Sequence, residues 1–173
     1  MRAAAPYDGA VRTAIIAYKE RDRRDLTPQL GALLSRSVGL ARPVLVPVPS
    51  ARAAARTRGG DHVLRLARLA ARTAGGRVEQ PLQLCRAVRD SAGLGAMERF
   101  VNLDGAMHAA PPTAPLTAPR MSVVVVDDIV TSGATIAEAV RALRTAGWLV
   151  SHAAVIAATP RRSGRHADPQ LLP

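Results

Sequence analysis

The chain has 173 residues, which is most simply one domain and is long enough to bury a substantial core. Its formal net charge is +11, and Lys19 is the only lysine, so its basic character comes almost entirely from arginine. Aromatic residues make up 2% of the chain, so the core must be aliphatic and rich in alanine.

The cysteine content and the hydropathy exclude several classes of protein. Cys85 is alone, which rules out a disulfide framework and a cysteine-based metal site, and we expect a small buried residue there. The first residues lack the apolar segment of a signal peptide, and no apolar run approaches the roughly 18 residues of a membrane span. We therefore expect a cytoplasmic protein. The arginine content reflects either genome base composition or attraction to polyphosphates or nucleic acid.

Two amphipathic helices are expected before any strand. Asp8 is the predicted N-cap of a helix over residues 8–19. Thr27 and Pro28 read as the N-cap and first residue of a second helix, whose apolar stripe includes Leu30 and Leu34. We expect residues 1–40 to form a small helical hood.

The first strand is expected over residues 44–48, where Pro47 and Pro49 prevent regular pairing and begin a rigid loop. That loop carries Arg52, Arg56 and Arg58 before a helix that Asp61 caps and Gly75 ends. Guanidinium groups bind a compact multivalent anion such as pyrophosphate through paired hydrogen bonds. The helical arginines, Arg65, Arg68 and Arg72, read as a solvated face.

The middle of the chain has weaker patterns. A short strand is expected around residues 82–88. Residues 89–108 are rich in glycine and charge and poor in apolar anchors, which is typical of an active-site lid or of a surface insertion. Residues 109–119 form an extended connector rich in proline and alanine.

The chain is organised around residues 123–135. Four consecutive valines predict a central strand that is buried on both faces. Two carboxylates and a tight turn follow, and from Ala134 the period is helical, with Glu138 and Arg141 turned away from the apolar stripe. A last strand over residues 148–157 and a basic tail over 159–173 complete an α/β fold with a mainly parallel sheet flanked by helices.

The turn between strand and helix is where chemistry is expected. The first amides of a helix have no internal partner and carry the positive end of its dipole, so they bind anions. Thr131, Ser132 and Thr135 add hydroxyl donors, and Gly133 lets the backbone approach a phosphate closely. Carboxylates at the end of the strand can accept hydrogen bonds from sugar hydroxyls. Together these features describe a site for ribose 5-phosphate.

This stretch resembles the phosphoribosyl pyrophosphate (PRPP) motif of type I phosphoribosyltransferases, in which a hydrophobic strand and paired acids precede a Thr-Ser/Thr-Gly-x-Thr loop. The resemblance implies a Rossmann-like fold. Other phosphate-binding motifs do not fit, because no Gly-Lys-Ser/Thr and no G-x-G-x-x-G follows a strand. A response-regulator receiver would need a further strand that ends in aspartate, and the only later acids are Glu138 and Asp168.

Three further stretches resemble the ComF/GntX-like subgroup, which is associated with bacterial competence. They are Tyr7-Asp8-Gly9 with Tyr18-Lys19, then residues 46–50 with 56–62, and then residues 94–106. Together they cover most of residues 7–158, and they imply one phosphoribosyltransferase-like domain over 1–173 with an α/β core at 43–158. Gly60, Asp61 and His62 replace the subgroup's usual Phe-Asn-Gln, and its cysteine-rich zinc ribbon is absent from this sequence.

The resemblance implies transfer of the 5-phosphoribosyl group from PRPP, with pyrophosphate as the leaving group, and thus a place in nucleotide metabolism. Mg²⁺ would arrive mainly on PRPP, because no dedicated cage of protein carboxylates is visible. The implied residues are Asp127 and Asp128 for the ribose; Thr131, Ser132, Gly133, Ala134 and Thr135 for the 5-phosphate; Pro49, Ser50, Arg52 and Arg58 for the pyrophosphate; and Arg99 and Asn102 on the lid.

Three functional hypotheses stay open at this point. The first is an active transferase whose acceptor lies under the hood. The second is a PRPP-binding accessory protein of DNA uptake that lacks transfer activity, with single-stranded DNA or the competence machinery as its partner. The third, a binder of single-stranded nucleic acid, is disfavoured because the chain offers few aromatic stacking platforms. The four histidines show no metal-ligand spacing and are expected to be incidental. The sequence leaves the acceptor and the oligomeric state undetermined.

Overall fold

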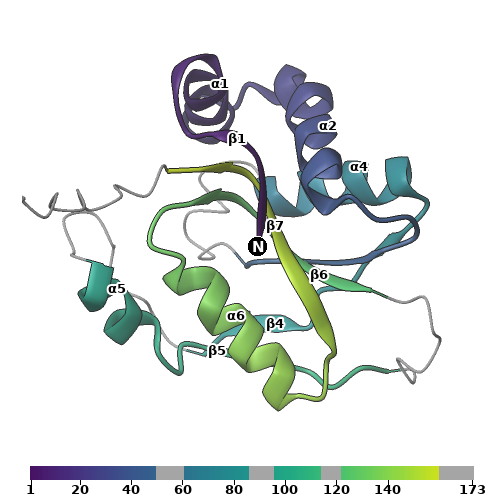
Figure 1. Cartoon of the computed structure of the whole chain (residues 1–173), viewed down its shortest axis with the longest axis vertical. Coiled ribbons are helices and arrows are strands. Elements are labelled where there is room, and N and C mark those ends of the chain that lie inside the picture. The colour runs from purple at the N-terminus through teal and green to yellow at the C-terminus, as the bar shows by residue number, and fades with distance from the viewer. Residues whose placement is uncertain (50–60, 86–95, 114–121, 160–173) are drawn as a thin grey trace, which may run out of the picture.

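The computed structural model describes residues 1–49, 61–85, 96–113 and 122–159, and of residues 96, 97, 99 and 100 it describes only the backbone (Figure 1). A five-stranded sheet forms its centre, in the order β1-β7-β6-β2-β3, and all neighbouring strands are parallel. The strands are β1 (Arg2–Pro6), β7 (Val150–Ala158), β6 (Val123–Val130), β2 (Val44–Pro47) and β3 (Arg77–Val78). The predicted α/β class with a mainly parallel sheet is therefore confirmed.

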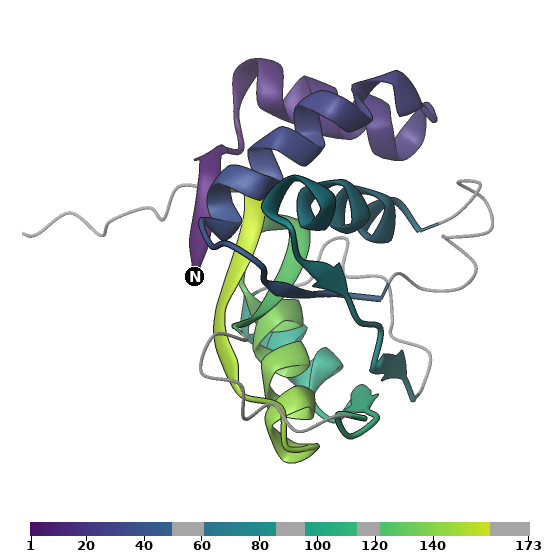
Figure 2. The ribbon, with the colours of Figure 1, turned by 90° about the vertical axis from the view of Figure 1, so that its right-hand side faces the viewer.

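Helices cover both faces of this sheet (Figure 2). On one face lie α1 (Gly9–Glu20), α2 (Thr27–Val38) and α4 (His62–Ala74), with a 3₁₀ turn at Arg24–Leu26. On the other face lie α6 (Ala134–Thr145) and a small antiparallel sheet of β4 (Leu82–Leu84) and β5 (Met107–Ala109). The helix α5 (Ala96–Leu103) follows β4 in the chain and contacts α6.

The four valines of β6 explain why this strand is central. Val124 and Val126 pack toward α1, α2 and α4, whereas Val123 and Val125 pack toward α6. All four are completely buried. Successive side chains of a strand point to opposite faces, so a strand that is covered on both sides needs an unbroken apolar run. The prediction of a central strand is confirmed.

The ends of two helices follow the predicted capping residues. Asp8 accepts a hydrogen bond from the Gly9 amide, and Asp61 accepts from the amides of the first turn of α4. Gly75 ends α4 in the left-handed conformation, with φ of 66°. The second helix differs from the prediction, because Thr27 is already helical and Leu26 is the N-cap.

The prediction that both amino-terminal helices precede any strand is wrong. Arg2–Pro6 forms the edge strand β1, which pairs in parallel with β7. Three of its five residues are alanine, which is depleted in strands, so the sequence carries little signal for it. The two-residue strand β3 also lacks a predicted counterpart, and β4 ends at Leu84, before the predicted limit.

Other expectations lie beyond the described ranges. Most of the predicted connector and nearly all of the basic tail fall in residues 114–121 and 160–173, which the structure does not describe. Among the described helices, none has the length and apolar character needed to cross a membrane.

Candidate active site

The end of β6 carries the two predicted acids, and it continues four residues further than expected. The strand was predicted to end before Asp127, but Ile129 and Val130 extend it by pairing with the end of β7. Both residues are β-branched and suit a strand. The turn is therefore confined to Thr131, Ser132 and Gly133, and α6 begins at Ala134.

This turn has the geometry of an anion site. Gly133 is the N-cap of α6 and has φ of 84°, a conformation that favours glycine. Glycine has no side chain that could cap the helix, so the first amides of α6 and the positive end of its dipole are left for another partner. The Ala134 amide does donate to Ser132 Oγ, at 3.3 Å. Thr131 is exposed, and Ser132 and Thr135 are half-buried.

The two acids do not occupy equivalent positions. Successive side chains of a strand point to opposite faces of the sheet. Asp127 therefore lies on the α6 face, with Val125, whereas Asp128 lies on the other face, with Val126, and contacts α1 and α4. Asp127 is half-buried, and its Oδ1 accepts from the Asp128 amide at 2.8 Å. The carboxylate of Asp128 is buried.

Asp128 is held by two side chains from separate helices. Lys19, near the end of α1, places Nζ 2.8 Å from Asp128 Oδ2. His62, the first residue of α4, places Nε2 2.7 Å from the same oxygen. The side chains of His62 and Asp128 are both 6% exposed, and that of Lys19 is 28% exposed.

These contacts separate the protonation behaviour of the two acids. Burial, together with the negative charge of Asp128, raises the pKa of Asp127 well above its usual value. Burial also acts to raise the pKa of Asp128, but the hydrogen bond with His62 and the charge of Lys19 outweigh it and hold that pKa below its usual range. Within the pair, Asp128 is therefore the stronger acid in the folded protein, and Asp127 binds a proton more readily.

The expectation that the histidines are incidental is wrong for His62, which is buried against the acid pair. Its ring meets Tyr18 edge-on, with ring centroids 6.4 Å apart. The guanidinium of Arg65 lies 5.9 Å from the centre of the Tyr18 ring and donates to its hydroxyl at 3.4 Å. Arg65 is thus half-buried rather than part of a solvated face, whereas Arg68 and Arg72 are exposed as predicted.

Neither Lys19 nor His62 was among the predicted site residues. One signal was available for Lys19, because it is the single lysine among 24 basic residues. His62 lies in a stretch that carries the subgroup resemblance, but its contact with Asp128 joins residues 66 positions apart, which no local pattern records.

The lid prediction concerns α5 and the turn that follows it. Of the two lid residues, Asn102 is half-buried, and the side chain of Arg99 lies outside the described part. Leu103 and Ala106 pack on Ala134, the first residue of α6. The carboxyl-terminal part of the predicted lid is therefore anchored on the first turn of α6.

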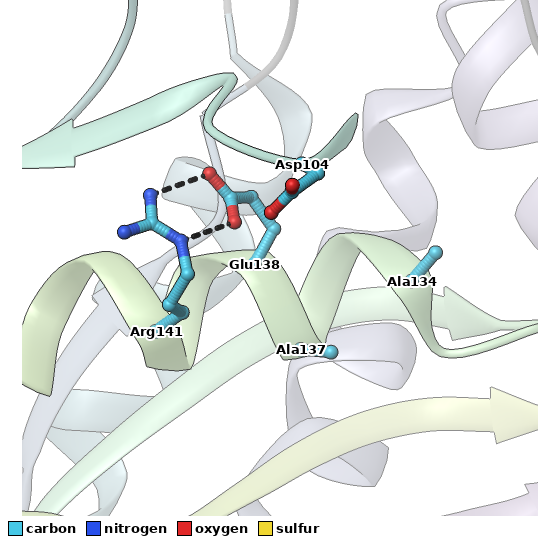
Figure 3. Close-up of a pocket in the computed structure, with 5 residues that line it drawn as sticks. All are labelled: Asp104, Ala134, Ala137, Glu138 and Arg141. Atoms are coloured by element: carbon cyan, nitrogen blue, oxygen red, sulfur yellow. Dashed lines mark hydrogen bonds and ion pairs between the residues drawn. The ribbon is translucent and has the colours of Figure 1, made fainter. Parts of the chain in front are cut away.

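A polar clamp strengthens this anchor. Glu138 was predicted to face away from the core, but it is buried at 5% exposure. It accepts from the Met107 amide at 2.9 Å and from the Arg141 guanidinium at 2.6 and 2.8 Å, and Arg141 also donates to the Met107 carbonyl. Figure 3 shows Glu138 and Arg141 at a pocket of about 250 Å³, which Asp104 and Ala134 also line.

The predicted pyrophosphate residues are only partly described. Pro49 is half-buried and follows Val48, whose amide donates to the Val126 carbonyl at 2.9 Å. This contact places the end of β2 beside Val126, the residue that precedes the acid pair. Ligands of parallel sheets bind beyond the carboxyl ends of the strands. Ser50, Arg52 and Arg58 lie outside the described residues.

The chemistry of the side chains bears on the predicted Mg²⁺. Within residues 1–49, 61–85, 96–113 and 122–159, no three His, Cys, Asp or Glu side chains gather to hold a metal ion. One acid of the pair, Asp128, is already held by a lysine and a histidine, and the arrival of Mg²⁺ on a bound pyrophosphate stays a prediction.

Cys85 was predicted to be buried, and this is wrong. It is exposed at the end of β4, and its Sγ lies 3.0 Å from His108 Nδ1 on β5. The antiparallel pairing of β4 and β5 brings these residues together across 23 positions.

Comparison with known families adds a finding that is independent of this geometry. A family model described as a phosphoribosyl transferase domain matches residues 65–170, more than half of the chain. The match includes β6, the turn and α6, and it leaves out α1, α2 and β2. Comparison with curated proteins gave no significant match.

Proposed function

The chain belongs to the phosphoribosyl transferase domain family, and we propose that it is a PRPP-binding enzyme of the ComF-like group. In this proposal it transfers a 5-phosphoribosyl group and releases pyrophosphate. The observation that carries this proposal is the order of the acid pair, the turn and the helix N-terminus along β6 and α6. An acid pair, of which Asp128 is buried, is followed within five residues by a left-handed glycine that forms the N-cap of a helix.

The proposed binding mode follows from the chemistry of these parts. The amides and hydroxyls of Thr131, Ser132, Gly133, Ala134 and Thr135 would hold the 5-phosphate. Asp127 and Asp128 would accept hydrogen bonds from the ribose hydroxyls. A phosphate monoester suits a helix N-terminus, because several amides and the dipole act on the same anion.

The proposed reaction breaks the bond between the anomeric carbon and the pyrophosphate and joins that carbon to an acceptor. The transition state resembles an oxocarbenium ion, and carboxylates near the ring stabilise its positive charge. Pro49, Ser50, Arg52 and Arg58 are the residues proposed for the pyrophosphate. Mg²⁺ bound to its oxygens would neutralise the leaving group.

The surrounding segments have proposed roles as well. Arg99 and Asn102 would close over the ligand and exclude the water that hydrolyses PRPP. The acceptor would lie under a hood within residues 1–40, and α1 is the best candidate because Lys19 reaches the acid pair from it. The proposed single domain spans 1–173, with its α/β core at 43–158, to which β1 is added as an edge strand.

The ComF-like assignment is supported by the residues around the site. Tyr18 and Lys19, which carry the amino-terminal part of that resemblance, lie beside Asp128 or its partner His62. The replacement of the subgroup's usual glutamine by His62 keeps a nitrogen that can donate to a carboxylate. The residues that carry the subgroup resemblance therefore lie next to the proposed ribose site.

A binding protein without transfer activity is the second candidate. It is favoured by the contacts of Asp128, because Lys19 and His62 already face Oδ2 and take up acceptor positions that an active site would offer to its substrate. In this case PRPP would regulate an accessory protein of DNA uptake, with single-stranded DNA or the competence machinery as its partner.

Release of pyrophosphate separates the two candidates. The full-length protein is incubated with PRPP and Mg²⁺, alone and with each of a panel of nucleobases, and pyrophosphate is measured with a coupled assay. The enzyme proposal expects release that depends on one base and is lost in Asp128→Asn. Binding of PRPP without base-dependent release would favour the accessory protein.

A further inference from the structure

Three elements that are distant in the sequence meet at one carboxylate oxygen. Lys19 from α1 and His62 from α4 approach Asp128 Oδ2 at 2.8 and 2.7 Å. The helices α1 and α4 and the central strand β6 thus converge on one carboxylate, and the side chain that carries it is 6% exposed. The family match begins at residue 65 and includes neither Lys19 nor His62.

A buried carboxylate needs such partners, because an ion without hydrogen bonds is strongly destabilised in the interior. Two donors on the same oxygen do more than offset that cost. They fix the rotation of the planar carboxylate group, and hence the directions in which its lone pairs point. A carboxylate that must accept from one particular hydroxyl benefits from this, since hydrogen bonds weaken steeply away from linearity.

The two donors are different in kind. Lys19 has a compact charge with three donors, and its side chain is 28% exposed, so part of it faces solvent. His62 is buried and is packed edge-on against Tyr18, so it is the rigid partner. His62 Nε2 can donate to Asp128 when it carries the proton.

We propose that Lys19 and His62 are positioning residues for Asp128, which they orient toward a ribose hydroxyl so that the site prefers ribose to deoxyribose. This inference rests on the proposed function, because it takes the acid pair as the ribose site. Asp127 is held differently, since it lies on the α6 side of β6 and its Oδ1 accepts from the Asp128 amide. The low pKa of Asp128, which His62 and Lys19 maintain against burial, agrees with a permanent hydrogen-bond acceptor.

The preference for ribose provides a direct test. Binding of ribose 5-phosphate and of 2-deoxyribose 5-phosphate is measured by calorimetry on the full chain. Both ligands carry the phosphate, but only the first presents a vicinal diol. The wild-type protein is expected to bind ribose 5-phosphate about tenfold more tightly, the equivalent of one charge-assisted hydrogen bond.

The variants separate orientation from folding. Lys19→Met and His62→Leu should each reduce the tenfold preference to about twofold or less. Both variants should still bind 2-deoxyribose 5-phosphate measurably, which reports a folded phosphate site. His62→Gln should keep most of the preference, because its carboxamide can still donate to Asp128. Arg12→Met is the matched control, since Arg12 is an exposed cation on the same helix as Lys19.

Each outcome bears on the inference. A wild-type preference that survives in both Lys19→Met and His62→Leu would overturn it while leaving the proposed function intact. So would a His62→Gln variant that loses the preference as fully as His62→Leu. A wild-type protein that binds neither sugar phosphate nor PRPP would contradict the proposed function and the inference with it.

Discussion

Replacing Glu138 by alanine tests whether the clamp on β5 stabilises the fold. Glu138 is 5% exposed, and it is the acceptor for the Met107 amide and for the Arg141 guanidinium. Leaving the buried Met107 amide without this acceptor costs about 1–3 kcal/mol. The ion pair adds about 0.5–1 kcal/mol at most, because Arg141 is 44% exposed and water screens it. We therefore expect Glu138→Ala to lower the free energy of unfolding by about 2–3 kcal/mol.

Chemical denaturation of the full chain measures this change, and Glu138→Gln is the matched variant. Glutamine keeps an oxygen for the Met107 amide but loses the charge that faces Arg141, so about half of the loss is expected. A thermal scan should show a drop of about 2–4 °C for each kcal/mol. The reasoning would be refuted by a Glu138→Ala protein within 0.5 kcal/mol of wild type, or by Glu138→Gln being as unstable as Glu138→Ala.

Three further predictions concern backbone conformation, pH and thiol exposure. Gly133→Ala and Gly147→Ala place the same strained residue at the two ends of α6, at φ of 84° and 89°, so each should lose about 1–2 kcal/mol of stability. In a PRPP binding assay only Gly133→Ala should weaken affinity, and equal effects would argue against an anion site at the turn. The hydrogen bond from Arg141 lowers the pKa of Glu138 below its ordinary value of 4.5. The ionised Glu138 side chain therefore stabilises the fold fully above pH 4.5, and this stabilisation is lost as the pH falls through the pKa of the folded state. Acid titration should therefore destabilise wild type more than Glu138→Gln, and parallel curves would count against this. Cys85 is exposed, so a thiol reagent should label it in the native protein at a rate close to that in denaturant, and strong protection would contradict the structure.

The sequence was most informative where one local pattern determines the structure. Four valines that need cover on both faces predicted the position of β6 in the sheet. Capping by Asp8 and Asp61 was readable because each bond lies within three residues of its helix start. The edge strand β1 was missed because an alanine-rich segment gains its strand conformation from pairing with β7, which no local pattern records.

The site residues that were not predicted were missed for the same reason, because their contacts join distant parts of the chain. The acids and the turn at residues 131–133 form one continuous stretch, so their proximity followed from their order. The partners of Asp128 come from residues 19 and 62, and only the packing of α1 and α4 on the sheet brings them there. Glu138 was misassigned because helical periodicity identifies an apolar face, and it does not foresee a carboxylate buried by a backbone amide and an arginine.

Calorimetric titration with PRPP in the presence of Mg²⁺ tests the central claim most directly. We expect saturable binding by the wild-type protein, a loss of at least about tenfold in affinity in Gly133→Val, and no loss in the helix-end control Gly147→Val. Undetectable binding by a folded wild-type protein, or equal affinities in the two glycine variants, would contradict the assignment of the β6–α6 turn as the phosphoribosyl site.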